Sequence, residues 1–467
     1  MTKQEKIFES SNVWSSIASM ALPAMASMVV MIFYNIADMF FVSFLGDTAQ
    51  VAAVSVTSPA LSVIMALGTM LGVGGSSLSA RTFGAGDGKQ MKIYSSVCCY
   101  GGILIGILVC AALLLFRAPL LHFLGANEEM WSYAETYLCI IAGGAPVMIF
   151  SMVLGFLLRA EGAVKEGMIG NLISTVTNIL LDPMFILILG MGVGGAAVAT
   201  VLANAVGAVY LIWYILRHNS GLSLSLKWAM KRPVALGAVI ALGMPNALST
   251  FLSSFASSFA NRLLVQYGTN SVAAMGAAGK ATMVIGMIQM GLCMGVQPLM
   301  AYHYGARNFK RLREILTRLT LLTVIIGGTL TMVCLFGSGA IVALFLKEEE
   351  ARLLGQQMVR LLVISGPFLG LYYIGANFLQ AAGNAKLSSI VSVLRQGVFL
   401  IPLLYAMNGL FGVTGNIWAH IAADIASAAV SVMVALCQYV QMTKQPLAPG
   451  ESGFSAHTGE VGRKQGY

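Results

Sequence analysis

Charged side chains are scarce in this sequence. Aspartate, glutamate, lysine and arginine together make up 10% of the 467 residues, whereas hydrophobic residues make up 58% and the mean hydropathy is +0.82. An ordinary soluble domain carries about 25% charged residues, so this chain could not cover itself with a polar surface. Several apolar runs exceed the roughly 20 residues that cross a bilayer as a helix. The composition excludes a soluble protein and predicts an integral membrane protein embedded in the lipid bilayer.

The sequence also lacks the motifs of catalysis and of bound cofactors. It has no phosphate-binding Gly-Lys-Ser/Thr loop, which argues against an ATP-driven pump, and no zinc-binding helix motif. Its seven cysteines lie mostly within apolar runs and lack the paired spacing of a zinc site or a disulfide framework. The first residues, "MTKQEKIFESSN", are too polar for a cleavable signal peptide. We therefore expect neither an enzyme nor a cofactor.

Long apolar runs dominate what the sequence does contain. They are continuous rather than alternating, which favours helices over barrel strands. The predicted fold is an all-α membrane protein with twelve transmembrane helices. Their expected limits are 14–44, 50–80, 93–116, 131–156, 166–189, 193–216, 236–266, 271–303, 313–346, 354–381, 387–407 and 412–441.

The lysines and arginines predict the orientation of these helices. With a cytoplasmic N-terminus, the inner segments hold 19 of the 27 basic residues and the outer segments hold three, Arg117, Lys347 and Arg352. Such a bias predicts that both termini are cytoplasmic. The formal charge of +9 is then a topology signal and no sign of a nucleic-acid partner. We expect a multi-pass protein of a prokaryotic inner membrane, with a cytoplasmic segment at 1–13 and a disordered cytoplasmic tail at 442–467.

The two halves of the chain repeat one pattern at a nearly constant offset of 221 residues. The matching pairs include "VAAV" at 51–54 with "VAAM" at 272–275, "FGAGD" at 83–87 with "YGARN" at 304–308, and "RAEGA" at 159–163 with "QAAGN" at 380–384. An even number of helices per copy makes the copies parallel, as in many secondary transporters. The sequence therefore predicts two pseudo-symmetric six-helix bundles. The first half is 14–216, the second half is 236–441, and a cytoplasmic linker at 217–235 joins them.

Two aspartates interrupt apolar helices of the first half. Asp182 lies in "NILLDPMFI", and Asp38 lies in "FYNIADMFF". A charge at the bilayer centre costs on the order of 3 kcal/mol, so such residues usually mark an ion path. Asn178 and Tyr34 each precede one of these acids by four residues and share its helix face. The acids predict a proton or cation site, and the alternative is a structural hydrogen bond between helices.

Three further charges lie within expected spans of the second half. Arg395 and Asp424 lie at similar depths, so we expect a structural ion pair. Lys280 has no obvious partner and is a candidate for the wall of a substrate cavity. Methionines 283, 287, 290 and 294 form one helical stripe, which suits either a cavity for varied apolar shapes or ordinary packing against lipid or a neighbouring helix.

A first helix with an early proline and a late aspartate, the "FGAGD" loop after the second helix, "LRAEG" after the fourth and "NILLDPMFI" in the fifth together resemble the multidrug and toxic compound extrusion (MATE) family. The sequence is most similar to the prokaryotic DinF-like branch. The resemblance covers roughly 14–441 and implies a two-lobed, V-shaped antiporter that exports amphipathic, often cationic compounds in exchange for H⁺ or Na⁺. It also implies a coupling site, open to Na⁺ as well as H⁺, at Asp38, Asn178, Asp182 and Thr200, while plain hydrogen bonding remains the alternative for Asn178 and Thr200. One branch of the family has coupling acids in the seventh and tenth helices, and "FLSSFASSF" and "LYYIGANF" contain none.

The expected function is therefore ion-coupled export of small amphipathic molecules by a monomer, with Tyr34, Lys280, Met283, Met287 and Met290 as candidate substrate contacts. A flippase for a lipid-linked or polysaccharide precursor is the alternative. Such a protein would need basic cavity groups for phosphate, and only Lys280 and Arg395 could serve. A membrane-embedded enzyme would need paired catalytic groups, which the sequence does not show.

Overall fold

A computed structural model describes residues 5–43, 48–218, 220–346 and 348–444, and the side chains of 5, 6, 34–43, 48, 269 and 444 lie outside the described part. The predicted tail therefore lies almost wholly outside the described residues. The described chain is nearly all helix, without a strand, and contains eleven helical stretches long and apolar enough to cross a membrane. The last of these, Ala385–Thr443, has 59 residues and would extend about 90 Å at 1.5 Å per residue, far more than one crossing needs. It breaks at Gly412, with φ 59° and ψ −136°, so the chain has the two final crossings that were predicted.

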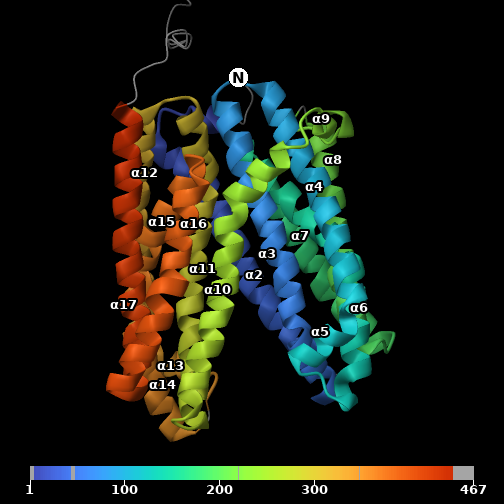
Figure 1. Ribbon diagram of the computed structural model, residues 1–467, viewed down its shortest axis with the longest axis vertical. Coiled ribbons are helices and arrows are strands. Elements are labelled where there is room, and N and C mark those ends of the chain that lie inside the picture. Colours follow the sequence, from blue (N-terminus) through green and yellow to red (C-terminus); the bar gives the residue numbers. More distant parts are fainter. Residues whose placement is uncertain (1–4, 44–47, 219, 347, 445–467) are drawn as a thin grey trace, which may run out of the picture.

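The elements of the first half run from the N-terminus to the end of the sixth crossing (Figure 1). They are α1 (Glu5–Phe8), α2 (Val13–Ser43), α3 (Thr48–Gly84), α4 (Gly88–Leu115), α5 (Arg117–Leu124), α6 (Glu128–Ala160), α7 (Val164–Pro183), the π-helix η1 (Met184–Ile188) and α8 (Gly192–Arg217). The predicted linker contains the short helix α9 (Leu226–Lys231).

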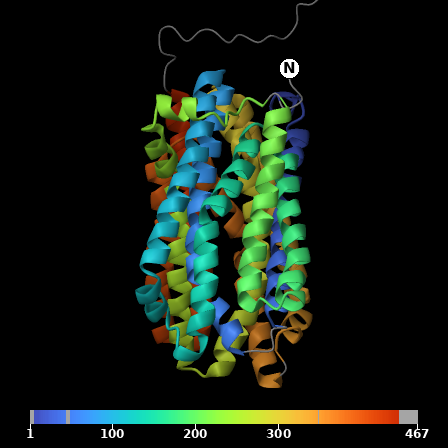
Figure 2. The same ribbon diagram turned by 90° about the vertical axis from the view of Figure 1, so that its right-hand side faces the viewer.

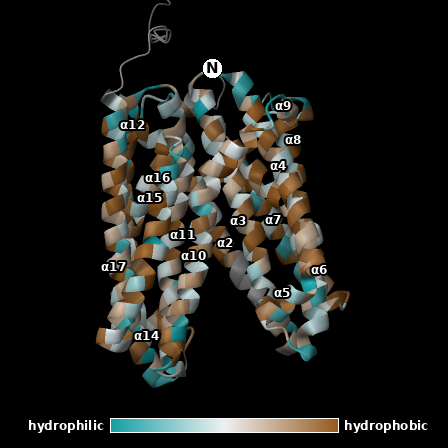
Figure 3. Ribbon diagram, viewed as in Figure 1, coloured by the Kyte–Doolittle hydropathy of each residue, from teal (hydrophilic) through white to brown (hydrophobic). Residues whose placement is uncertain are grey.

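The second half repeats this order. Its elements are α10 (Ala235–Val265), α11 (Thr269–Gly305), α12 (Phe309–Phe336), α13 (Ser338–Ala343), α14 (Glu349–Leu362), the 3-10 helix η2 (Val363–Ser365), α15 (Gly366–Ala381), α16 (Ala385–Val393), the π-helix η3 (Leu394–Leu400) and α17 (Ile401–Lys444). Large apolar side chains of both halves are exposed, as on a surface that faces lipid. Hydrophobic residues run along the helices of both bundles (Figure 3).

The two bundles converge at one end and diverge at the other, which makes the molecule V-shaped (Figure 1). In the side view of Figure 2 the two bundles overlap, and their long helices run roughly upright. We call the converging end, which carries α9 and the turns 83–87 and 304–308, the linker end, and the opposite end the open end. Helices α2 and α3 of the first half pack there on α10 and α11 of the second half. The arrangement agrees with the predicted fold of two six-helix bundles.

Glycines at repeat-related positions bring the halves into contact at the linker end. A Cβ on Gly84 would overlap the backbone of Tyr302, and a Cβ on Gly305 would overlap the backbone of Arg81. Gly84 and Gly305 are 221 residues apart, so α3 and α11 cross about the pseudo-twofold axis that the repeat predicts. Small residues permit such close backbone approach between membrane helices.

The N-terminal segment closes the same end with an apolar anchor. Phe8 is fully buried and stacks on Tyr302, with ring centroids 4.6 Å apart, while Phe83 meets it edge-on at 5.8 Å. The backbone carbonyl oxygen of Phe8 lies 3.1 Å from His303 Nε2. The sequence analysis did not predict this contact, because the first twelve residues are mostly polar. The contact joins the N-terminal segment to both halves.

Candidate functional site

Three of the four predicted coupling residues form a buried cluster within the first half. Asn178 and Asp182 lie on α7, Thr200 lies on α8, and each is at most 4% exposed. Asn178 Nδ2 lies 3.3 Å from Asp182 Oδ1 and 3.5 Å from Thr200 Oγ1, and donates to both oxygens. The Thr200 hydroxyl donates to the carbonyl of Ala196 at 3.0 Å. One amide thus links a carboxylate and a hydroxyl on two neighbouring helices.

The local sequence explains how these side chains meet. A spacing of four residues places Asn178 and Asp182 on the same face of α7. Proline at 183 cannot donate a backbone hydrogen bond, and the regular α-helix ends there and continues as η1. Gly195 lets α8 approach this irregular turn closely, since a Cβ there would lie 2.8 Å from the carbonyl carbon of Phe185. That approach sets Thr200 beside the face that carries the acid.

Asp38 and Tyr34, the other two candidates of the first half, have side chains outside the described residues. Their backbone belongs to α2, and α2 packs against α7, the helix of Asp182. The predicted pairing of the two aspartates stays a prediction.

Hard oxygen atoms dominate the cluster. Asn178 Oδ1 is buried and has no hydrogen-bond partner among the described residues. A buried amide oxygen usually has a partner, and leaving it without one costs free energy. Together with the Asp182 carboxylate and the Thr200 hydroxyl, it provides the ligand type that small hard cations prefer. The donor set therefore fits a hard cation, and the carboxylate alone would serve a proton.

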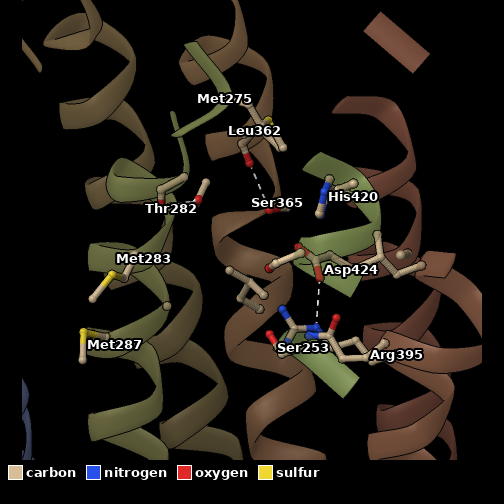
Figure 4. A pocket seen from close by; sticks show the side chains of 18 of the residues that line it. Ser253, Met275, Thr282, Met283, Met287, Leu362, Ser365, Arg395, His420 and Asp424 are labelled. Carbon is tan, nitrogen blue, oxygen red and sulfur yellow. Dashed lines mark hydrogen bonds and ion pairs between the residues drawn. The ribbon is translucent and has the colours of Figure 1, made fainter. Parts of the chain in front are cut away.

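A cavity of about 590 Å³ lies within the second half. Its walls come from α10, α11, α14, η2, α15, η3 and α17 (Figure 4). Serines, asparagine and threonine on α10 and α11, namely Ser253, Ser257, Asn261 and Thr282, share the lining with apolar residues. The mixture of apolar and uncharged polar groups is typical of sites for small organic molecules.

Arg395 and Asp424 form an ion pair in the wall of this cavity. Arg395 Nε lies 3.0 Å from Asp424 Oδ1, and each side chain is 14% exposed. The guanidinium carbon lies 4.7 Å from the centroid of the Tyr372 ring and 5.8 Å from that of Tyr373. The two residues that sequence depth suggested as partners are thus together, and their net charge is close to zero.

Three members of the methionine stripe, Met283, Met287 and Met290, are among the lining residues of this cavity, whereas Met294 is buried elsewhere. In Figure 4, Met283 and Met287 project from the side of α11 that is turned away from Arg395 and Asp424. Lys280 is exposed on the same helix and is not among the lining residues. Of the two interpretations of the stripe, the cavity fits three of its four members.

His420 is a lining residue that the sequence analysis did not single out. It lies on α17 one turn before Asp424, and the buried Nε2 has no hydrogen-bond partner among the described residues. The internal repeat could have found it. Near the ends of the copies the offset is 220, since "VGG" at 193–195 matches "VTG" at 413–415. At that offset His420 corresponds to Thr200 and Asp424 to Asn204.

A buried acid also lies outside the spans, at the linker end. Glu161 accepts hydrogen bonds from Ser220 Oγ at 2.5 Å and from the backbone N–H of Gly221 at 2.7 Å. Burial raises the pKa of this carboxyl above its ordinary value, and the two hydrogen bonds oppose the rise. These contacts fasten the linker between the halves to the first half.

Comparison with known proteins relates the chain to one transporter family. The MatE family model matches residues 23–184 and again 245–406, one match within each copy of the internal repeat. The chain is 31% identical to the multidrug export protein MepA of Staphylococcus saprophyticus over 430 residues and to that of Staphylococcus aureus over 428 residues. Each alignment covers 91% of this chain and 94% of the relative.

Solved structures show the same fold. A multidrug resistance MATE family transporter of the MOP superfamily, in an outward-facing conformation, has a TM-score of 0.90 at 24% identity. A MOP superfamily transporter from Pyrococcus furiosus, whose binding pocket is described as having reverse polarity, has a TM-score of 0.88 at 24% identity. Both comparisons cover 95% of this chain and 100% of the other.

Proposed function

Because the chain belongs to the MatE family, we propose that it is a secondary active antiporter that exports amphipathic, cationic compounds in exchange for H⁺ or Na⁺. The staphylococcal relatives are named multidrug export proteins, and the alignments cover 94% of their length. This similarity supports drugs and other toxic organic compounds as substrates. The observation that carries the coupling half of this proposal is the buried cluster of Asn178, Asp182 and Thr200.

In this proposal the cluster carries the coupling ion. A carboxylate buried among membrane helices is costly unless it is protonated or neutralised by a cation. Binding and release of an ion at Asp182 therefore change the stability of the surrounding structure. Since the regular α-helix of α7 ends at Pro183 and continues as η1, α7 can change its conformation at this point. Asn178 holds the carboxylate in place and Thr200 adds an oxygen from α8. Asp38, on the adjacent helix α2, is the proposed second acid of the same site.

The proposed substrate site is the cavity of the second half. Flexible methionines on one wall can adapt to varied apolar shapes, and the serines, Asn261 and Gln396 supply hydrogen bonds. Since Asp424 already neutralises Arg395, the cavity carries little net positive charge. That balance favours organic cations over the phosphate-bearing precursors that a flippase would move.

Transport then follows alternating access between the two bundles. The positive charge of the linker end predicts that it faces the cytoplasm, so the V opens outward. We propose that binding and release of the coupling ion bias this outward-facing shape against an inward-facing one in a monomer of the prokaryotic inner membrane, with both termini cytoplasmic.

Efflux from vesicles tests the proposal directly. Proteoliposomes that contain the purified protein are loaded with a fluorescent organic cation. An H⁺ gradient and a Na⁺ gradient are then imposed in separate experiments. We expect one of the two gradients, when its ion moves in the direction opposite to the organic cation, to accelerate movement of the organic cation. The variants Asp38→Asn and Asp182→Asn should each abolish that acceleration. Movement of the cation that ignores both gradients would contradict antiport, and movement of a labelled phospholipid instead would favour the flippase.

A further inference from the structure

A buried arginine lies inside the first half, near its linker end. Arg159 belongs to the last turn of α6 and is 4% exposed. An arginine at the end of a membrane helix usually extends its guanidinium outward into water. Here the guanidinium turns back into the bundle, and its Cζ lies 4.9 Å from the centroid of the Phe156 ring. Nε and Nη1 are buried and have no hydrogen-bond partner among the described residues. Arg159 therefore places a positive charge without water around it inside the first half.

The two acids nearest to Arg159 in the sequence are bonded elsewhere. Glu161 accepts hydrogen bonds from the linker, and Glu166 accepts one from the Tyr210 hydroxyl at 2.7 Å. A guanidinium stays protonated in a protein, so the charge of Arg159 persists. A buried charge without an ionic partner is costly, and inside a membrane it usually marks a function.

The repeat-related residue of the second half is neutral. Gln380 follows Arg159 by 221 residues and is 2% exposed. Its Oε1 accepts a hydrogen bond from Gln297 Nε2 at 3.1 Å. The scaffold thus forms with a buried glutamine at this position and needs no arginine for its fold. The charge at this position occurs in the half that contains the cluster of Asp182.

One face of α7 connects Arg159 with that cluster. A Cβ on Gly167 would lie 3.7 Å from Arg159 Cγ. Asn171, Asn178 and Asp182 follow Gly167 at helical spacings of four, seven and four residues and share this face. Asn171 is exposed although its Oδ1 points toward α6, so space remains between the two helices there. Asp182 lies 15 residues from Gly167, which is about 22 Å along the helix. Arg159 therefore lies between the cluster and the linker end.

We propose that Arg159 is the inner barrier of the ion path, which stops a cation at the Asp182 cluster from passing to the linker end in the V-shaped conformation. This inference rests on the proposed coupling site. A cation that moved along this face of α7 would approach a fixed positive charge in an environment of low dielectric constant, where repulsion is strong. Arginines exclude protons and cations from other membrane pores in this way. An antiporter needs such a barrier, because a path open at both ends would dissipate the ion gradient without moving substrate.

The test measures passive ion entry without any organic substrate. Proteoliposomes that contain the purified full-length protein receive a membrane potential, negative inside, and a fluorescent indicator follows the entry of H⁺ or of Na⁺ in separate experiments. Arg159→Gln introduces the residue of the second half. We expect it to raise the entry of at least one of the two ions by more than about tenfold, since a small part of the repulsion between two charges in a protein interior amounts to that factor.

Two further substitutions at the same position separate charge from shape. Arg159→Met removes the charge with a side chain that suits an apolar span, and ion entry should rise as in Arg159→Gln. Arg159→Lys keeps the charge, and ion entry should stay close to that of the wild type. Entry that stays low in both uncharged variants, or that rises equally in the lysine variant, would overturn the proposal.

Two controls separate the barrier from faulty folding. Gln380→Met removes a buried polar group at the repeat-related position and should leave ion entry unchanged. The double variant Arg159→Gln with Asp182→Asn removes the acid that attracts the cation, so ion entry should fall again, whereas entry through a misfolded protein would persist. Equal entry in the single and double variants, or raised entry in Gln380→Met, would contradict the barrier.

The outcome is distinct from that of the efflux experiment, because no organic cation is present. A wild type whose efflux responds to a gradient, together with uncharged variants that admit no ions, would contradict the barrier and leave antiport in place. A wild type without gradient-driven efflux would contradict antiport, whereas ion entry that depends on Arg159 and Asp182 would still support a barrier in an ion path of the first half.

Discussion

The two halves share a scaffold and differ in the chemistry they bury. The first half encloses Asn178, Asp182 and Thr200 in a compact cluster between α7 and α8. The second half, at the corresponding pair of helices, has a cavity with Arg395 bound to Asp424 and His420 nearby. Thr200 and His420 occupy the same place in the repeat, and so do Asn204 and Asp424.

This difference teaches how a duplicated fold can divide its work. Asp182 is held by the neutral amide of Asn178, whereas Asp424 is bound to the guanidinium of Arg395 and keeps a nearly constant environment. We infer that the first half handles the coupling ion and the second half handles the organic substrate. This division of roles between the halves can be tested with variants of each half, beginning with the largest expected effect.

The strongest test compares Asp182→Asn with Asp424→Asn. Asparagine at 182 can neither load a proton nor balance a cation, so the stimulation of efflux by the ion gradient should fall by more than about tenfold, the scale of a typical coupling free energy. Asparagine at 424 should lower efflux and leave the response to the gradient in place. Both are measured as the ratio of efflux with and without the gradient in proteoliposomes. A lost response in Asp424→Asn, with a normal response in Asp182→Asn, would reverse the assignment of the halves.

The second prediction concerns stability. Arg395→Met leaves Asp424 without its cation in a mostly buried position, which should lower the free energy of unfolding by about 3 kcal/mol. The double variant Arg395→Met with Asp424→Leu removes both charges and should recover most of that loss. Thermal unfolding in detergent measures both. If the double variant is no more stable than the single one, the pair is not held together mainly by charge.

The third prediction compares two buried threonines with the same local hydrogen bond. Thr200 donates to Ala196 O at 3.0 Å and lies in the cluster, whereas Thr57 on α3 donates to Ala53 O at 2.8 Å and lies outside it. Thr200→Val removes one oxygen from the cluster, which should cost about 1 kcal/mol, or about fivefold in the concentration of the driving ion that gives half-maximal efflux. Thr57→Val should leave that concentration unchanged. Equal shifts in the two variants would point to a general packing effect.

The smallest expected effect concerns a difference at the linker end, where Glu161 of the first half corresponds to Ala382 of the second. Burial raises the pKa of Glu161 above its ordinary value of 4.5, so the folded protein keeps this proton to a higher pH than the unfolded chain does. The resulting stability is present below the ordinary pKa and is lost as pH rises through the raised one. Glu161→Gln should remove that decline of the free energy of unfolding.

A companion variant sharpens this pH test. The hydroxyl of Ser220 stabilises the ionised form of Glu161, so Ser220→Ala should raise the pKa further and extend the decline to higher pH. Thermal unfolding measured from about pH 4 upward follows both variants. A profile that Glu161→Gln leaves unaltered would assign the pH dependence to other groups.

Several features of the site could be derived before the structure was known. The spacing of Asn178 and Asp182 places both on one helix face, and similar depth suggested that Arg395 and Asp424 meet. Other features could not be derived in this way. Phe8 sits in a polar segment, His420 looks like a residue at a membrane interface, and nothing local reveals that the guanidinium of Arg159 is buried. Each of these depends on which distant helix lies opposite.

The sequence by itself determined that the chain spans the membrane in twelve helices, that the helices form two parallel copies, and that one carboxylate, Asp182, lies within an apolar span of the first copy. Those properties follow from hydrophobicity, helical periodicity and repetition, which are local or act between copies of one pattern. Only the tertiary structure decided which side chains form the cluster, the cavity of the second half and the close contact at the linker end. Membrane helices have similar apolar surfaces, so their rotation and partners are set by close packing at a few small residues, such as Gly84 and Gly305.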